Sequence, residues 1–340
     1  MTSMATAAIA DRLVHGLRSR TIDVSRSTGL SLPTIAHTLF LGCGIPASVS
    51  LGTDAAGSFS GAFEQPLENI KRVGVLGAGT MGVGIAQAVA HAGISVAVYG
   101  RREGPRLAAV GEALRTAAGG RTAGIYVGSD LQVVSRSDVI IEAIAEDPAA
   151  KVEVLEDVWR MNPGPPPVFA TTTSSLSITE LQRRLGDRLV LVGAHFFNPA
   201  STNPLVELIQ GNAPREALDR VAGLCRRLGK SPTVVPDTPG FVVNRVLIPY
   251  LNDFFGEISR GVDIRALDQH MRKLYRLPLG PSRLADLIGL DVVLAIQESL
   301  AERESDLSLR PAPLLKALVK NGILGRKSGH ALASAPIGLN

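Results

Sequence analysis

A glycine-rich turn near residue 77 constrains the fold of this chain more than any other feature. It follows the apolar run Val73-Gly74-Val75-Leu76, has the spacing Gly-x-Gly-x-x-Gly, and precedes the helical pattern of residues 84–90. In such a turn the first glycine permits a tight bend, the second lets backbone approach a pyrophosphate, and the third lets the helix pack on the strand. The helix N-terminus would attract the phosphates. The turn therefore predicts a parallel α/β sheet that binds a dinucleotide; the alternative is a tight strand–helix turn without a ligand. The predicted cofactor contacts of this turn are Gly77, Gly79, Thr80, Met81 and Gly82.

The residue after the second predicted strand bears on the choice of dinucleotide. This strand covers residues 95–99, and Gly100 follows it, eighteen positions after Gly82. An acidic side chain at this position would accept hydrogen bonds from the ribose hydroxyls of NAD. Glycine cannot do so, and it removes a negative charge that would repel a 2′-phosphate. Arg101 and Arg102 can supply charge-assisted hydrogen bonds to that phosphate. The pattern predicts that NADP(H) is preferred over NAD(H); alternatively, Gly100 only weakens NAD binding and the arginines are solvated.

Two polar residues accompany later apolar runs. Ser174 comes after the run 167–170, and His195 comes at the end of the run 189–195. In an open α/β sheet, ligands bind beyond the carboxyl ends of the strands. Both side chains are therefore expected at the edge that carries the glycine turn. Each also has a simpler interpretation, because a histidine after a strand is often a core residue, and Ser174 could cap the helix that follows it.

The order of several motifs points to a known family. From about Lys71 to Gly329 the chain contains, in sequence, GAGTMGVGIA, TSSLSITEL, HFFNPA, LVELI, PGFVVNR, PLGPSRLADLIGLD and GRKSG. In these motifs it resembles the 3-hydroxyacyl-CoA dehydrogenase family, and in size it is nearest to the short-chain 3-hydroxybutyryl-CoA enzymes of bacteria. The resemblance implies reversible oxidation of an (S)-3-hydroxyacyl thioester to the 3-oxoacyl thioester, with 3-hydroxybutyryl-CoA and acetoacetyl-CoA as the simplest pair.

The resemblance also implies roles for individual residues. His195 matches the catalytic histidine, and an imidazole is suited to taking the hydroxyl proton while C3 gives up hydride. Glu207 matches its carboxylate partner, which would fix the tautomer. Ser174 matches the serine that hydrogen-bonds the reacting oxygen, and Asn244 matches the asparagine that contacts substrate and supports the histidine. The positions that match cofactor contacts of the family are Glu146, Lys151, Ser174 and Lys327.

Three departures from the family accompany Gly100. The segment from Gly100 to Glu142 is shorter than the family's, which puts in doubt a helical hairpin that touches coenzyme A. Thr171-Thr172-Thr173 replaces Ser-Asn-Thr and removes one amide near the nicotinamide. After Gly329 the usual Gly-Phe-Tyr is missing.

Because the segment that would contact coenzyme A is shortened, substrates other than coenzyme A thioesters are also compatible with the sequence. The same fold could act on an acyl-carrier-protein thioester or on a free hydroxy acid. A rival of another class is a protein that binds NADP(H) without turnover.

The chain divides by composition into three parts. Residues 1–70 are rich in Ser, Thr, Gly and Ala, and we expect a poorly ordered extension there. The alternatives are an organellar leader or a small partner-binding helix, since Ile9, Leu13 and Leu17 recur every four residues. Residues 71–238 are expected to form a Rossmann-type, mostly parallel sheet. Residues 239–340 are expected to be all-helical, with helices over 242–257, 264–274, 286–303 and 313–319, and the resemblance implies that they form a homodimer interface.

Charge and cysteine content exclude several classes of protein. The 340 residues carry a net charge of +4 without a run of about five or six like charges, so no nucleic-acid partner is expected. The longest apolar runs fall short of about 18 residues, so no membrane span is expected. Cys43 and Cys225, the only cysteines, form neither a disulfide framework nor a metal site, and they favour a reducing compartment such as the cytoplasm.

Overall fold

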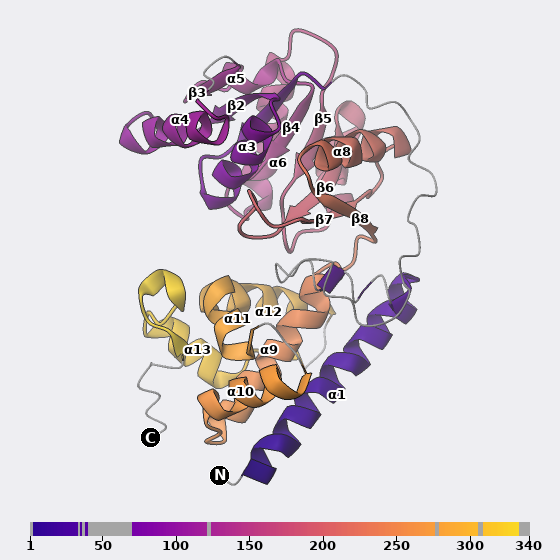
Figure 1. The fold of residues 1–340 in the computed structure, drawn as a ribbon. Helices are drawn as coiled ribbons and strands as arrows, with labels where there is room; N and C mark the ends of the chain where they lie inside the picture. Colours follow the sequence, from indigo (N-terminus) through magenta and orange to yellow (C-terminus); the bar gives the residue numbers. More distant parts are fainter. Residues whose placement is uncertain are drawn as a thin grey trace. The chain divides into compact units, whose positions relative to one another are not determined.

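A computed structural model describes residues 3–32, 35, 38, 39, 70–120, 124–275, 279–304 and 309–332 of the chain. The described residues form two compact units. One comprises those within Ser48–Thr238, and the other those within Met1–Ala47 together with Pro239–Asn340. Figure 1 shows the elements of each unit. Among the described residues, no helix has the length and apolar character needed to cross a lipid bilayer.

The first unit is built on one eight-stranded sheet in the order β3-β2-β1-β4-β5-β6-β7-β8. All neighbouring strands are parallel except β6 and β7, which are antiparallel. This arrangement confirms the predicted Rossmann-type, mostly parallel sheet. The strands are β1 (Arg72–Leu76), β2 (Ser95–Tyr99), β3 (Ile125–Gly128), β4 (Val139–Glu142), β5 (Val168–Thr171), β6 (Val190–Phe196), β7 (Leu205–Ile209) and β8 (Ser231–Val235).

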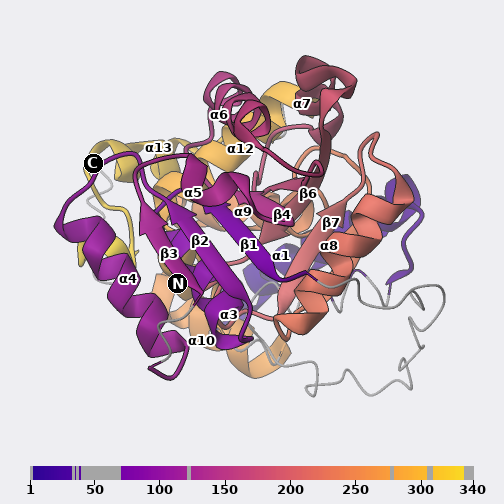
Figure 2. The same ribbon diagram turned by 90° about the horizontal axis from the view of Figure 1, so that it is seen from above.

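Helices cover both faces of this sheet, which explains why its central strands are nearly continuous apolar runs. On one face, α3 (Thr80–His91), α4 (Pro105–Ala117) and α8 (Arg215–Arg227) pack their apolar side chains against the strands in a single core. The other face carries α5 (Gln132–Ser135), α6 (Pro148–Met161) and α7 (Ile178–Leu185). Figure 2 shows α3, α4 and α8 around this sheet from above. A single helix, α4, joins β2 to β3 among the described residues of that connection.

The described residues of the second unit that follow Thr238 are mainly helical, in agreement with the predicted fold class. Its C-terminal helices are α9 (Val243–Ser259), α10 (Ile264–Tyr275), α11 (Pro281–Ile288), α12 (Leu290–Glu304) and α13 (Pro313–Lys320). The prediction of a single helix over 286–303 is wrong, because the helix is interrupted at Gly289, between α11 and α12. Gly289 has φ of 100°, a conformation that glycine adopts readily and that ends a right-handed helix. The apolar pattern continues across the break, so periodicity alone did not reveal it.

The expectation of a poorly ordered extension is wrong for its first part, because Ser3–Thr28 forms helix α1, which packs on α9 and α10. Several side chains of α1 are buried, Ile9, Leu13 and Val24 among them, so α1 presents an apolar stripe to these helices. Two ion pairs flank the contact, from Arg12 to Glu257 at 3.3 Å and from Arg20 to Asp253 at 2.8 Å. Most of the rest of the extension, including 40–69, lies outside the described residues.

Candidate active site

The glycine turn between β1 and α3 has the packing expected of a dinucleotide cradle. A Cβ atom on Gly77, whose φ is 117°, would lie 2.4 Å from the carbonyl oxygen of Ala143, and one on Gly82 would lie 2.0 Å from the carbonyl oxygen of Gly77. A Cβ on Gly79 would meet nothing within 4 Å. The first and third glycines are therefore required by close packing, whereas the second has its open side free for a ligand. These are the separate requirements of a pyrophosphate-binding turn.

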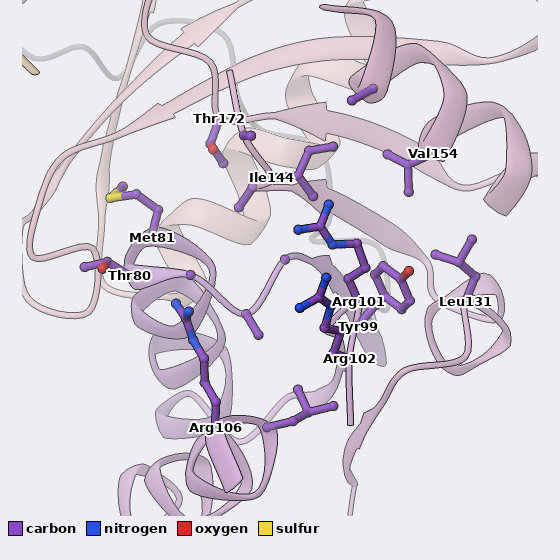
Figure 3. Close-up of a pocket in the computed structure, with 18 of the residues that line it drawn as sticks. Thr80, Met81, Tyr99, Arg101, Arg102, Arg106, Leu131, Ile144, Val154 and Thr172 are labelled. Atoms are coloured by element: carbon purple, nitrogen blue, oxygen red, sulfur yellow. The ribbon is translucent and has the colours of Figure 1, made fainter. Parts of the chain in front are cut away.

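A cavity of about 1120 Å³ opens at this turn, within the first unit (Figure 3). It brings together most of the predicted cofactor residues, although they come from four connections of the sheet. Gly82 packs behind the turn and does not line the cavity. The predicted residues that line it are Gly77, Gly79, Thr80, Met81, Gly100, Arg101, Arg102, Glu146 and Ser174.

Three arginines project into this cavity near Gly100. Arg101 and Arg102 follow β2, and Arg106 comes from the first turn of α4 (Figure 3). Sequence reasoning did not single out Arg106, although its spacing from the arginine pair was a usable signal. A Cβ on Gly100 would lie 2.6 Å from Leu107 Cδ1 and 3.1 Å from the Cβ of Ala78. Leu107 therefore fills part of the space beside Gly100, and any side chain at position 100 would require Leu107 to move.

The two residues predicted to form the acid–base pair face each other across the antiparallel strands. His195 in β6 and Glu207 in β7 are register partners, so their side chains lie on the same face of the sheet. His195 Nδ1 is 2.8 Å from Glu207 Oε2, and both side chains are buried. The Phe197 ring packs against the imidazole with 4.4 Å between the ring centroids. A carboxylate that accepts the Nδ1 proton fixes the neutral tautomer in which Nε2 carries the lone pair.

Ser174 follows β5 at the same edge of the sheet. Thr171, the last residue of β5, is opposite Gly193 in the parallel neighbour β6, and Ser174 lies three residues further on, lining the cavity. Its backbone N–H donates to Glu146 Oε1 at 3.0 Å. Burial alone raises the pKa of Glu146, but Lys151 and hydrogen bonds from residues 173–175 outweigh burial and lower that pKa below its ordinary value of 4.5.

The other predicted site residues are placed differently. Lys151 is buried beside the cavity rather than lining it, with its ammonium group bonded to Glu142 at 2.7 Å. Asn244 and Lys327 belong to the second unit. Asn244 is buried in the first turn of α9, and Lys327, in the short helix Arg326–Ser328, pairs with Asp291. Sequence reasoning missed Glu142 as a partner of Lys151.

The parallel sheet, the glycine turn at the cavity and the buried histidine–carboxylate pair define a dinucleotide-binding oxidoreductase. Comparison with known families narrows this class. Residues 72–238 match the model of the NAD-binding domain of 3-hydroxyacyl-CoA dehydrogenase, and residues 240–334 match the model of its C-terminal domain. The chain belongs to the 3-hydroxyacyl-CoA dehydrogenase family, which confirms the resemblance seen in the motifs.

Individual relatives agree with this assignment. The chain is 40% identical over 277 residues to a probable 3-hydroxybutyryl-CoA dehydrogenase of Bacillus subtilis, covering 77% of this chain and 96% of the relative. It is 34% identical over 275 residues to the 3-hydroxybutyryl-CoA dehydrogenase of Clostridioides difficile, covering 76% and 96%. Among solved structures, the (S)-3-hydroxybutyryl-CoA dehydrogenase of Ralstonia eutropha superimposes with a TM-score of 0.70 at 36% identity, covering 77% of this chain and 98% of that one.

Proposed function

We propose that this chain catalyses the reversible oxidation of an (S)-3-hydroxyacyl thioester to the 3-oxoacyl thioester, with 3-hydroxybutyryl-CoA and acetoacetyl-CoA as its substrate pair. The observation that carries the proposal is the buried His195–Glu207 pair, on a sheet whose carboxyl edge carries the dinucleotide turn. The relatives named 3-hydroxybutyryl-CoA dehydrogenase support the substrate class. The names of these relatives and the chemistry of the His195–Glu207 pair both support oxidation of a 3-hydroxyacyl group.

Oxidation of a secondary alcohol requires a base for the hydroxyl proton and an acceptor for the hydride. A bound nicotinamide dinucleotide supplies the acceptor. His195 takes the hydroxyl proton at Nε2, and Glu207 stabilises the imidazolium that results, because its carboxylate already accepts the Nδ1 proton. In reduction the same nitrogen returns the proton. Ser174 donates a hydrogen bond to the reacting oxygen, and Asn244 contacts the substrate.

The preferred cofactor of the proposed enzyme is NADP(H). Gly100 removes the carboxylate that would hold an unmodified ribose, and three guanidinium groups, from Arg101, Arg102 and Arg106, line the adjoining part of the cavity. A 2′-phosphate there would gain charge-assisted hydrogen bonds. The match to an NAD-binding domain model supports the dinucleotide and leaves this preference as a proposal.

The direct test is the initial rate of acetoacetyl-CoA reduction with NADPH and with NADH in parallel. We expect NADPH to be favoured by about 10-fold or more in kcat/KM, as one or two hydrogen bonds to a charged group would give. Arg102→Ala should reduce this preference, whereas Arg115→Ala, which removes an exposed arginine paired with Glu112 on α4, should leave it unchanged. A preference for NADH would retain the activity and overturn the cofactor proposal.

Further assays separate the remaining alternatives. Reduction rates with the acetoacetyl thioesters of coenzyme A and of acyl carrier protein, and with free acetoacetate, identify the carrier. A rate with the coenzyme A thioester below that with the carrier-protein thioester would replace the proposed substrate. Binding of NADPH with no turnover on any of them would favour the non-catalytic alternative.

We also propose a cytoplasmic homodimer, which fractionation and light scattering of the full chain would test.

A further inference from the structure

Three charged side chains form a connected cluster beside the cofactor cavity. Glu142 ends β4, Glu146 lies in the loop after it, and Lys151 lies near the start of α6. Lys151 Nζ lies 2.7 Å and 2.9 Å from the two carboxylate oxygens of Glu142 and 3.3 Å from Glu146 Oε2. Glu142 and Lys151 are buried, whereas Glu146 lines the cavity. The cluster thus reaches from the interior of the sheet to the site.

The buried end of the cluster joins the ends of two strands. Besides Lys151, Glu142 accepts a hydrogen bond from Thr171 Oγ1 at 2.5 Å and one from the backbone N–H of Ile144 at 2.7 Å. Thr171 is the last residue of β5, and Ile144 lies in the loop that lines the cavity after β4. A buried carboxylate with this many donors is held in one orientation, so it provides a fixed anchor for Lys151.

The exposed end of the cluster holds the loop that carries Ser174. Glu146 Oε1 accepts from the Thr173 hydroxyl at 2.5 Å, from the backbone N–H groups of Ser174 and Ser175 at 3.0 Å and 3.2 Å, and from the Ser175 hydroxyl at 3.0 Å. Its other oxygen faces Lys151. One carboxylate oxygen therefore fastens the loop, and the second is fixed from behind by a buried cation.

We propose that Glu146 is a positioning residue for Ser174, and that Lys151 and Glu142 act through it by fixing its carboxylate. This inference rests on the proposed function for the role of Ser174. It also gives Lys151 a different task from direct cofactor contact, because its ammonium group is directed at two carboxylates and it does not line the cavity. Without Lys151, the two carboxylates would repel each other and Glu146 would turn away from the loop.

The first test needs neither cofactor nor turnover. Hydrogen exchange of the Ser174 and Ser175 amides should be slow in the ligand-free protein and at least about 10-fold faster in Glu146→Ala, because the amides lose their acceptor. Glu146→Gln, which retains a carbonyl acceptor, should restore part of the protection. Glu153→Ala removes another carboxylate of the same cavity and should leave these amides unchanged. Equal exchange in wild type and Glu146→Ala would overturn the proposal.

The second test is a double-mutant cycle on kcat. If Glu146 acts through Ser174, Glu146→Ala should lower kcat about 10-fold in the wild type and less than about 2-fold in the Ser174→Ala background, because coupled residues are not additive. Lys151→Met should behave in the same way. Equal losses in both backgrounds, accompanied by weaker NADPH binding in a fluorescence titration, would instead make Glu146 a cofactor contact. A wild-type enzyme without turnover would refute the proposed function, while the exchange experiment would still decide the role of Glu146.

Discussion

Two buried pairs of ionisable residues lie near the carboxyl edge of the same sheet, and they differ in the chemistry of the side chain that faces the carboxylate. Lys151 and Glu142 join a helix to a strand, and every oxygen of Glu142 has a donor within the fold. His195 and Glu207 join two antiparallel strands, and His195 Nδ1 lies 2.8 Å from Glu207 Oε2. A lysine ammonium keeps its proton at neutral pH, whereas an imidazole can exchange one. A pair of the first kind maintains geometry, and a pair of the second kind is suited to proton transfer.

The largest effect is expected from Glu207→Gln on turnover. The amide keeps the size of the side chain and can still accept the Nδ1 proton, but it loses the charge that stabilises the imidazolium. General acid–base catalysis contributes about 10²- to 10⁴-fold, so we expect kcat to fall by at least about 10²-fold with little change in stability. Initial rates and thermal unfolding of the same preparation measure both. A variant with nearly full turnover would show that this pair is structural too.

Lys151→Met is expected to act mainly on stability, in addition to its smaller effect on kcat. Removal of one partner of a buried pair leaves an uncompensated charge on Glu142, which typically costs about 3–5 kcal/mol of unfolding free energy. Urea unfolding can be followed selectively, because Trp159, the single tryptophan of the chain, lies on the same helix, α6. Arg160→Met is the matched control, since Arg160 makes only exposed ion pairs on α6. Equal stability of the two variants would contradict the comparison.

The two pairs also differ in how far the sequence predicts them. His195 and Glu207 lie in apolar runs of adjacent strands, and the strand pattern together with the family motifs indicated both positions. The contact of Lys151 with Glu142 depends on the path of the chain from β4 into α6, which brings the start of the helix back against the strand end. No periodicity encodes that path, so the sequence predicted a cofactor contact for Lys151 and missed its partner.

The two units also show that local structure is predicted from the sequence better than contacts between distant segments. The strand–turn–helix of residues 72–91 is local, and its pattern predicted it closely. The stripe at Ile9 and Leu13 was visible in the sequence, but its order depends on the surface of α9 and α10, more than two hundred residues away. Amphipathic helices in proteins owe most of their stability to such packing, so the sequence alone favoured a poorly ordered segment.

Packing of α1 gives a third prediction, of intermediate size. Leu13 is 3% exposed in α1, on the side that packs against the C-terminal helices. Leu13→Ala removes buried methyl groups and leaves a cavity, so we expect a loss of about 2–3 kcal/mol in the unfolding free energy of this unit, at the lower end of the usual range. Denaturation followed by far-ultraviolet circular dichroism measures it. Ile22→Ala, on the same helix at 40% exposure, should cost much less, and equal costs would mean that α1 does not pack as described.

The smallest effect is expected from the ion pair between Arg12 of α1 and Glu257 of α9. Its atoms are 3.3 Å apart, the Arg12 side chain is 60% exposed, and Glu257 also pairs with Arg260 at 3.0 Å. Arg12→Met therefore leaves no charge buried and unpaired, and exposed pairs contribute about 0–1 kcal/mol. We expect a change in that range by the same denaturation assay, and a smaller one at high salt because screening already weakens the pair. A loss approaching that of Lys151→Met would mean that burial is not what separates a structural ion pair from a dispensable one.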